Sequence, residues 1–344
     1  MAFSPNYSIT NSLLQSAKQI AALTAELNRR VIAQPILVEL ERRASALSSH
    51  ASTRIEGNPL PLTEVKKLLK SLPANLGTSE REVVNYNAAL SSLHQQLQDA
   101  SPALTLKRIL GIHRTVMKGL LEPYHCGRLR AEPVVVNDPR TGRVVYLAPD
   151  AKDVRGLLDE CLAFLQTSQR AVDPLILAGL FHRQFVIIHP FTDGNGRTVR
   201  LATKVLLATL GIDTFPLFSF ENFYISDITR YLGQVGVSGN YYDIRDRIDF
   251  TSWLEYFAEG ILDELTRVSD ELELATASPE STPLPHHRLI LKHIERHGYI
   301  TDRDYSKLTD RAKATRALDF KRLIEWGLIE RLGRGKKTYY KVKA

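Results

Sequence analysis

Apolar residues recur every three or four positions through most of the chain, which is the spacing of amphipathic helices. Residues 12–30 and 34–56 each place Leu, Ile and Ala on one helical face, and Thr63 is positioned to cap a short helix that follows them. The other long helices predicted by this pattern cover residues 78–98, 103–121, 174–188, 199–210 and 253–275. We therefore expect a mainly α-helical protein.

One stretch departs from the helical pattern. Val134–Val136 and Val144–Tyr146 are β-branched runs on either side of Asn-Asp-Pro-Arg-Thr-Gly, a sequence typical of a turn. The pattern predicts a β-hairpin. A lone hairpin is marginally stable by itself, so in a helical protein it usually has a function.

The candidate chemistry is concentrated in residues 189–200, between two predicted helices. The first of these helices has Asp173 as its N-cap and Pro174 in its first turn, and the second stops at Gly211. The stretch is therefore a loop that leads into a helix N-terminus. Free backbone N–H groups and the positive end of the helix dipole favour a bound anion there.

The residue types in this loop suit a phosphate. Gly194 and Gly196 let the backbone approach a ligand closely. Arg197 and Arg200, three positions apart, share a helix face and can fork onto phosphate oxygens. Asp193 is a hard oxygen donor of the kind that Mg²⁺ takes together with substrate phosphates.

His189 is the residue of the stretch whose ordinary pKa lies near neutrality, so it suits a general base. Simpler interpretations explain less of the pattern. A Gly-Asn-Gly sequence alone would be a turn, and His189 with Asp193 would need a third metal ligand that is not nearby. The patterns of a dinucleotide fingerprint and of a P-loop are both absent.

The whole run, His-Pro-Phe-Thr-Asp-Gly-Asn-Gly-Arg-Thr-Val-Arg, resembles the H-x-F-x-D/E-G-N-G-R-x-x-R signature of the Fic family. The resemblance implies a Fic-type helical bundle that transfers AMP from ATP, with Mg²⁺, onto hydroxyl side chains of target proteins and of itself. It also implies a role for each residue: His189 as the base, Asp193 on Mg²⁺, Gly194, Asn195 and Gly196 in the anion hole, Phe191 in the core, Arg197 on phosphate and Arg200 on the γ-phosphate.

The end of the second predicted helix carries another resemblance. Thr53 and Glu56 have the spacing of a capping box, but a capping box should precede a helix, and here Gly-Asn-Pro follows. Ser52, Glu56 and Gly57 instead resemble the S/T-x-x-x-E-G/N inhibitory motif of Fic proteins. By this resemblance Glu56 would pair with Arg200 and take the arginine that the γ-phosphate needs.

The predicted hairpin resembles the Fic flap, in which an exposed strand edge pairs with a segment of the target protein. Val134, Val135 and Val136 would then dock the target; a structural β-ribbon is the alternative. Relatives often carry a Tyr-Tyr pair near the adenine. Here Tyr241-Tyr242 lies in a Gly/Ser/Asn-rich stretch that looks like an insertion, so the adenine-contacting residues stay unassigned.

The composition indicates a cytoplasmic protein without membrane association. No apolar run approaches the roughly 18 residues of a membrane span, and the start lacks the pattern of a signal peptide. Cys126 and Cys161 are too few for a disulfide framework or a metal cage.

The net charge of +7 is unevenly placed. Residues 285–344 hold 16 Lys and Arg against 7 Asp and Glu, whereas the rest of the chain holds 29 against 31. We expect an N-terminal helical region (1–100) with the inhibitory helix at 34–57, a Fic core (101–274), a Pro-rich linker (275–285) and a basic module (286–344).

The basic module has three predicted helices and two strands, 328–332 and 338–342, and resembles a winged helix-turn-helix. Arg311, Lys313, Arg316 and the wing lysines would meet DNA phosphates. Such modules also mediate protein contacts, which is the alternative, and a homo-oligomer is compatible with either.

The leading hypothesis is a protein adenylyltransferase that Glu56 inhibits by pairing with Arg200. One alternative keeps the scaffold but transfers another nucleotidyl or phosphoryl group. The other is a DNA-binding regulator that senses nucleotide, and the base His189 argues against it because binding alone needs no base.

Overall fold

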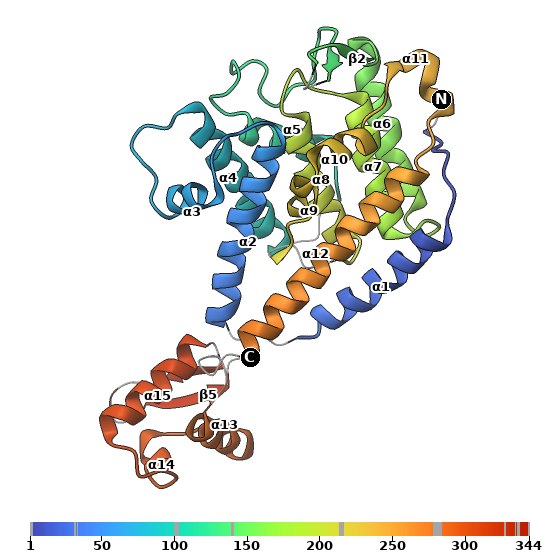
Figure 1. The fold of residues 1–344 in the computed structure, drawn as a ribbon. Coiled ribbons are helices and arrows are strands. Elements are labelled where there is room, and N and C mark those ends of the chain that lie inside the picture. The colour runs from blue at the N-terminus through green and yellow to red at the C-terminus, as the bar shows by residue number, and fades with distance from the viewer. Residues whose placement is uncertain are drawn as a thin grey trace. The chain divides into compact units, whose positions relative to one another are not determined.

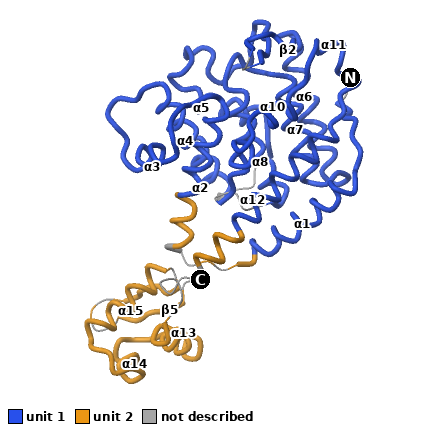
Figure 2. Tube along the Cα trace, viewed as in Figure 1, with its two compact units in different colours: residues 1–28, 43–268 blue, residues 29–42, 269–344 orange. Residues whose placement is uncertain are grey.

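A computed structural model of the protein describes residues 3–30, 32, 34–99, 103–138, 141–212, 217–277, 284–326, 328–333, 335 and 338–342. The chain divides into two compact units (Figure 2). The first comprises Met1–Asn28 and Arg43–Val268, and the second comprises Arg29–Arg42 and Ser269–Ala344.

The first unit is mainly helical, as expected (Figure 1). Its helices are α1 (Asn11–Leu27), α2 (Gln34–Ile55), α3 (Leu62–Lys70), α4 (Thr78–Asp99), α5 (Leu106–Val116), α6 (Ala151–Ser168), α7 (Pro174–Ile188), α8 (Asn195–Thr209), α9 (Glu221–Ser226), α10 (Ile228–Val235), α11 (Tyr241–Ile244), the 3₁₀ turn η2 (Arg245–Arg247) and α12 (Thr251–Ala277). The first residues of α2 and the last of α12 belong to the second unit.

Helix α8 lies at the centre of this unit and packs against α4, α5 and α7. Helix α7 is buried along almost its whole length. As predicted, Asp173 caps α7: its Oδ1 accepts a hydrogen bond from the N–H of Leu175 at 2.8 Å. The loop between α7 and α8 is thus held between two buried helices, which keeps its backbone in place.

The predicted hairpin is present as β1 (Val135–Asn137) and β2 (Val144–Leu147), paired antiparallel with Val136 opposite Tyr146. Val134 lies just before β1. A third strand, β3 (Gly239–Asn240), pairs parallel with β2 and was not predicted. Its two residues have little intrinsic preference for a strand, so the pairing depends on tertiary contact.

Several element ends differ from the predicted ones. Pro61, not Thr63, is the N-cap of α3, and it makes no side-chain cap. Helix α5 starts at Leu106 because Thr105 accepts from the N–H of Arg108, and α8 starts at Asn195 rather than at 199. Helix α6 was not predicted, although its buried apolar residues follow helical spacing.

The second unit contains α13 (Pro285–His297), α14 (Asp302–Tyr305), α15 (Lys313–Glu325), β4 (Ile329–Leu332) and β5 (Tyr339–Val342). The two strands form the expected C-terminal hairpin. Apolar residues of the helices, of β4 and of the connection between α13 and α14 make the core: Ile290, Ile294, Ile300, Tyr305, Phe320, Leu323, Trp326 and Ile329. Thr301 caps α14, its side chain accepting from the N–H of Asp304. The winged helix-turn-helix assignment stays a prediction.

Two of the arginines expected to meet DNA phosphates have carboxylate partners. Arg311 forks onto Asp319 at 2.8 and 3.0 Å, and Arg316 forks onto Asp302 at the same two distances. Lys313 is exposed. The wing lysines, Lys336 and Lys337, lie outside the described residues.

The predicted linker begins later than expected, because α12 continues to Ala277. Residues 278–283 of this linker are outside the described part of the chain. Within the described part, every helix is too short or too polar to cross a membrane.

Candidate active site

The loop of the sequence motif begins with an unusual backbone conformation. His189 ends α7 with φ 50° and ψ 61°, and it is the one non-glycine residue with positive φ in the described part of the chain. A left-handed conformation costs a side-chain-bearing residue on the order of 1–3 kcal/mol, so surrounding contacts must hold it. It turns the chain out of α7 and into the loop.

Phe191 and Asn195 close the loop from inside. The Phe191 N–H donates to Asn195 Oδ1 at 2.9 Å, and Asn195 Nδ2 donates to the Phe191 carbonyl at 2.8 Å. The buried Phe191 ring stacks on His113, with ring centroids 3.7 Å apart. The amide of Asn195 is therefore used to fix the loop, which leaves its backbone N–H as its contribution to an anion site.

His113 supports the same loop from α5. Its Nδ1 accepts from the Gly127 N–H at 2.8 Å, so its proton is on Nε2, which donates to the Asp193 carbonyl at 3.0 Å. Burial lowers the pKa of His113 to about 4, and the ring is neutral at physiological pH. His113 is therefore a structural histidine with a partner on each ring nitrogen.

Gly194 lies against α5 with φ 77°, and a Cβ at this position would come 2.5 Å from Met117 Sδ. The loop can approach α5 this closely because residue 194 has no side chain. The adjoining Asp193 side chain points outward and is 54% exposed.

Arg197 is almost fully buried between two carboxylates. Its Nη2 lies 3.2 Å from Asp193 Oδ1, and its Nη1 lies 3.4 Å from Glu82 Oε1 on α4. Glu82 also accepts from Asn58 Nδ2 at 2.7 Å, just beyond the end of α2. Glu82 was not anticipated from sequence, because only the fold brings α4 to this loop.

Arg200 is also buried, and it donates hydrogen bonds to α2 and to the residue that follows it. Its Nε donates to Ser52 Oγ at 2.8 Å, and its Nη2 donates to the Ser52 carbonyl at 2.9 Å and to Glu56 Oε1 at 2.6 Å. Burial alone would lower the pKa of Arg200, but the Glu56 carboxylate and nearby tyrosines outweigh it and the net pKa is raised. The structure thus brings together Ser52, Glu56 and Arg200.

Glu56 also lies over the glycines of the loop. A Cβ on Gly196 would be 2.2 Å from Glu56 Oε1, so the carboxylate rests directly on the backbone at the N-terminus of α8. Gly57, with φ 93°, ends this segment in a conformation that favours glycine. A carboxylate therefore lies where the sequence predicts an anion.

The His189 imidazole is arranged as a base. Burial lowers its pKa from the ordinary value, and the neutral ring is the form that accepts a proton. The Val186 carbonyl lies 3.4 Å from Nδ1. Because a carbonyl can only accept, this contact favours the tautomer with the proton on Nδ1, which leaves a lone pair on Nε2.

A buried polar cluster extends one turn further along α8. Lys204 Nζ lies 3.0 Å from Glu221 Oε2, and Glu221 Oε1 accepts from the Tyr86 and Ser48 hydroxyls. Both ionic side chains are fully buried. Sequence reasoning missed this cluster, because only the fold brings Lys204, Glu221 and Tyr86 together.

The hairpin offers a free edge. In the sheet order β1-β2-β3, β2 is central, and no other described strand pairs with the outer side of β1. Val135 is 46% exposed there. The Tyr146 hydroxyl, on β2, donates to the Ile187 carbonyl at 2.8 Å and so ties the hairpin to the end of α7.

Tyr241 and Tyr242 lie beside β3 and line a pocket of about 580 Å³ together with α6 and residues 3–6. The Tyr242 hydroxyl donates to Asp153 Oδ2 at 2.5 Å. None of the motif residues 189–200 lines this pocket.

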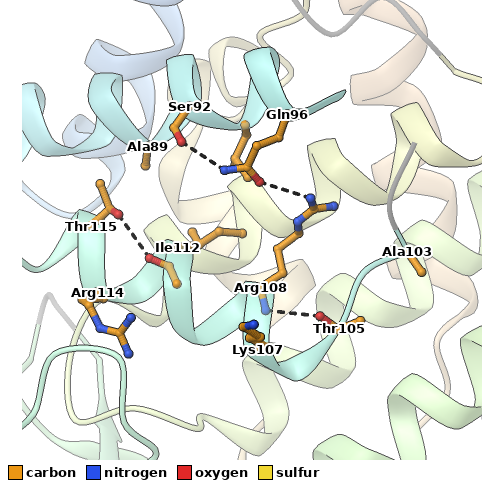
Figure 3. Close-up of a pocket in the computed structure, with 12 residues that line it drawn as sticks. Ala89, Ser92, Gln96, Ala103, Thr105, Lys107, Arg108, Ile112, Arg114 and Thr115 are labelled. Atoms are coloured by element: carbon orange, nitrogen blue, oxygen red, sulfur yellow. Dashed lines mark hydrogen bonds between the residues drawn. The ribbon is translucent and has the colours of Figure 1, made fainter. Parts of the chain in front are cut away.

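A second groove, of about 590 Å³, runs between α4 and α5 (Figure 3). Its polar side chains bond to one another: Arg108 Nη2 donates to Gln96 Oε1, and Gln96 Nε2 donates to Ser92 Oγ, both at 3.1 Å. No motif residue lines this groove either.

Comparison with known proteins shows which family and which fold the chain resembles. Residues 103–207 match the Fic/DOC family. Protein adenylyltransferase Fic of Nematostella vectensis is 31% identical over 207 residues, which cover 58% of this chain and 44% of that protein. Protein adenylyltransferase fic-1 of Caenorhabditis elegans is 29% identical over 205 residues, covering 58% and 39%. The chain thus spans less than half the length of these curated relatives.

Solved structures share the fold. A Fic family protein from Desulfovibrio desulfuricans G20 superposes with a TM-score of 0.65 at 22% identity, over 99% of both chains. Fic-1 from C. elegans superposes with a TM-score of 0.60 at 23% identity, over 76% of this chain and 73% of that one. Residues 103–207 thus match the Fic/DOC family, and the solved structures share the fold.

Proposed function

We propose that this chain is a protein adenylyltransferase that transfers AMP from ATP to a hydroxyl side chain, and that Glu56 holds it inactive. The observation that carries the proposal is the arrangement at the N-terminus of α8: His189 and Asp193 lie in the loop before the helix, and Arg197 and Arg200 lie in its first turns. The names of the similar proteins support a nucleotidyltransferase acting on proteins.

In the proposed reaction, a target hydroxyl attacks the α-phosphorus of ATP, the bond to the β-phosphate breaks, and pyrophosphate leaves. Nε2 of His189 takes the hydroxyl proton. The backbone N–H groups of Asn195 and Gly196 would face the phosphates, because the start of a helix has N–H groups without helical partners. The Gly194 N–H, which donates to Asp193 Oδ1 in the structure, would join them on leaving that carboxylate. Arg197 binds phosphate, and Arg200 binds the γ-phosphate once it is free of Glu56.

Asp193 fits a role in holding Mg²⁺. It is exposed, and its Oδ2 has no hydrogen-bond partner among the described residues, while Oδ1 accepts from Gly194 and lies 3.2 Å from Arg197. A carboxylate with one free oxygen beside a phosphate site suits an ion that takes one or two carboxylates and substrate phosphates. The ion would neutralise charge on the phosphates.

Inhibition follows from competition for one guanidinium. Glu56 pairs with Arg200 at 2.6 Å and lies on the backbone of Gly196. A γ-phosphate would therefore lose its arginine and be repelled by the carboxylate at the same time. Ser52 and Gly57 support this arrangement by holding Arg200 and ending the helical segment.

The proposal is tested by incubating the full chain with Mg²⁺ and ATP labelled on the α-phosphate. We expect Glu56→Gly to raise label transfer at least about tenfold. This corresponds to a free-energy difference of about 1.4 kcal/mol for the competition of Glu56 with the γ-phosphate. Glu56→Gln keeps the length of the side chain but removes its charge, so it should give an intermediate rate. Adding His189→Ala to Glu56→Gly should reduce transfer by about 10² to 10⁴.

Equal labelling of wild type and Glu56→Gly would contradict the inhibitory role, and labelling that persists without His189 would contradict the mechanism. Label transferred from the γ-phosphate would indicate phosphoryl transfer instead. Competition with UTP, read as the mass added to the protein, separates AMP from UMP. Nucleotide binding without any transfer would favour the nucleotide-sensing alternative.

The acceptor is proposed to be a protein segment added to the free edge of β1, where Val134, Val135 and Val136 would supply the main-chain contacts. This role rests on the unpaired edge and the exposed Val135 side chain. The basic second unit is proposed to be a winged helix that contacts DNA, and a homo-oligomer is compatible with both.

A further inference from the structure

Arg130 is buried next to the candidate site and contacts the backbone at the start of the motif loop. Arg130 as a whole is only 4% exposed. Nε donates to the His189 carbonyl at 2.8 Å, Nη2 lies 3.4 Å from the Ile188 carbonyl, and the backbone N–H donates to the Pro190 carbonyl at 3.0 Å. Three consecutive carbonyls at the end of α7 are thus held by one residue.

The same guanidinium also holds both flanks of the hairpin. Nη1 donates to the Glu132 carbonyl at 3.0 Å, and Nη2 donates to the Pro149 carbonyl. Glu132 precedes β1 and Pro149 follows β2, so these two contacts enclose the hairpin. Arg130 therefore joins two parts of the molecule that are far apart in sequence: the base of the hairpin and the backbone of His189.

The position of these contacts matters because His189 has a strained backbone. Its left-handed conformation persists only if its neighbours hold it, and Arg130 binds the carbonyls of His189 and of the next residue. A planar fork with several donors suits this task, because one rigid group can satisfy carbonyls from different segments at fixed angles. An ammonium group has no such plane.

We propose that Arg130 is a positioning residue that fixes the hairpin in place relative to His189. A target segment added to β1 would then present its hydroxyl to Nε2 of His189. This inference rests on the proposed function. Tyr146 makes a second, neutral link of the same kind through its hydrogen bond to the Ile187 carbonyl.

The test uses Arg130→Lys in the Glu56→Gly background, because lysine keeps the positive charge but loses the fork. We expect kcat for AMP transfer to fall by about 10- to 100-fold, since small misplacements of reacting groups have effects of this size. The dissociation constant for ATP, measured by calorimetry, should stay within about twofold, because no phosphate-binding group is altered. Arg128→Lys, the same change at an exposed position two residues earlier, should leave both quantities unchanged.

Hydrogen–deuterium exchange gives a readout that does not depend on activity. In Arg130→Lys we expect faster exchange in residues 133–138 and 141–148 and also in residues 186–191, with other segments unchanged. If this variant does not fold, Tyr146→Phe removes only the second link. It should show the same pattern, with a smaller fall in kcat of about two- to tenfold.

The inference is overturned if Arg130→Lys transfers AMP at the parental rate, if ATP affinity falls by the same factor as the rate, or if exchange changes in only one of the two segments. A Glu56→Gly parent that transfers no AMP would defeat the proposed function instead. The exchange experiment then decides the role of Arg130 by itself: coupled acceleration of both segments supports it, and its absence contradicts it.

Discussion

The residues of the motif stretch 189–200 have two kinds of role: some carry reactive or charged groups, and others hold the loop in shape. His189, Asp193 and the arginines carry groups that can act on a nucleotide, whereas Phe191 and Asn195 hold the loop in shape. Their amide and ring are buried in contacts with the protein itself. An identical set of side chains in a flexible loop would bind phosphate weakly, because ordering the loop would cost conformational entropy.

The titration of His189 leads to a prediction at this scale. Burial lowers its pKa below the ordinary 6.5, so the ring stays neutral, and able to accept a proton, to a more acidic pH than a free histidine. In Glu56→Gly the rate of transfer should therefore fall only below pH 6.5. Because Glu56 raises the pKa of His189, its removal should move the midpoint further down. The dependence of kcat/KM on pH tests this, and an acid limb centred above 6.5 would refute it.

At the scale of elements, α2 presents a polar stripe to the core. Ser48, Ser52 and Glu56 are spaced four residues apart and so lie along one side of the helical segment. They bond to Glu221 and Arg200, which are buried on other elements. The proposed inhibition would therefore depend on how the whole of α2 packs, as well as on one carboxylate.

Ser52→Ala tests this seating. The change leaves Arg200 Nε without its acceptor, and an unsatisfied buried donor costs about 1–3 kcal/mol. We expect the contact between Arg200 and Glu56 to become less stable. AMP transfer should rise, but by less than in Glu56→Gly. Ser49→Ala is the matched control. Ser49 is equally buried, but its hydroxyl donates to the Ser45 carbonyl of its own helix at 2.8 Å and lies 3.4 Å from Asn87 Oδ1 on α4, so it does not hold Arg200. A rise of the same size in both variants would argue against a specific role for Ser52.

At the scale of the whole molecule, positive charge is concentrated in the last sixth of the chain, in the second unit. The structure separates two kinds of basic residue there. Arg311 and Arg316 are bound to buried or partly buried carboxylates and stabilise the unit, while Lys313 is exposed at the start of α15. Charge counting cannot distinguish these roles.

If the second unit binds DNA, Lys313→Gln in the full chain should weaken binding and reduce the slope of log K against log salt by about 1. Arg316→Gln should instead lower the melting temperature, because it leaves Asp302 without its partner. Fluorescence anisotropy with duplex DNA at several salt concentrations, and thermal unfolding, measure the two effects. No binding even at low salt would favour a protein partner for this unit.

The sequence by itself determined the helical class, the hairpin and the stretch 189–200, because these depend on local patterns: apolar periodicity, β-branched runs around a turn, and a dense set of chemically distinct residues. It also singled out Ser52, Glu56 and Arg200 by resemblance. Only the tertiary structure decided which groups touch them. Glu82 beside Arg197, His113 under Phe191 and Arg130 beneath His189 come from separate elements, and their contacts arise when those elements pack around α8. Local sequence cannot encode such proximity, since it depends on how distant apolar faces are buried together.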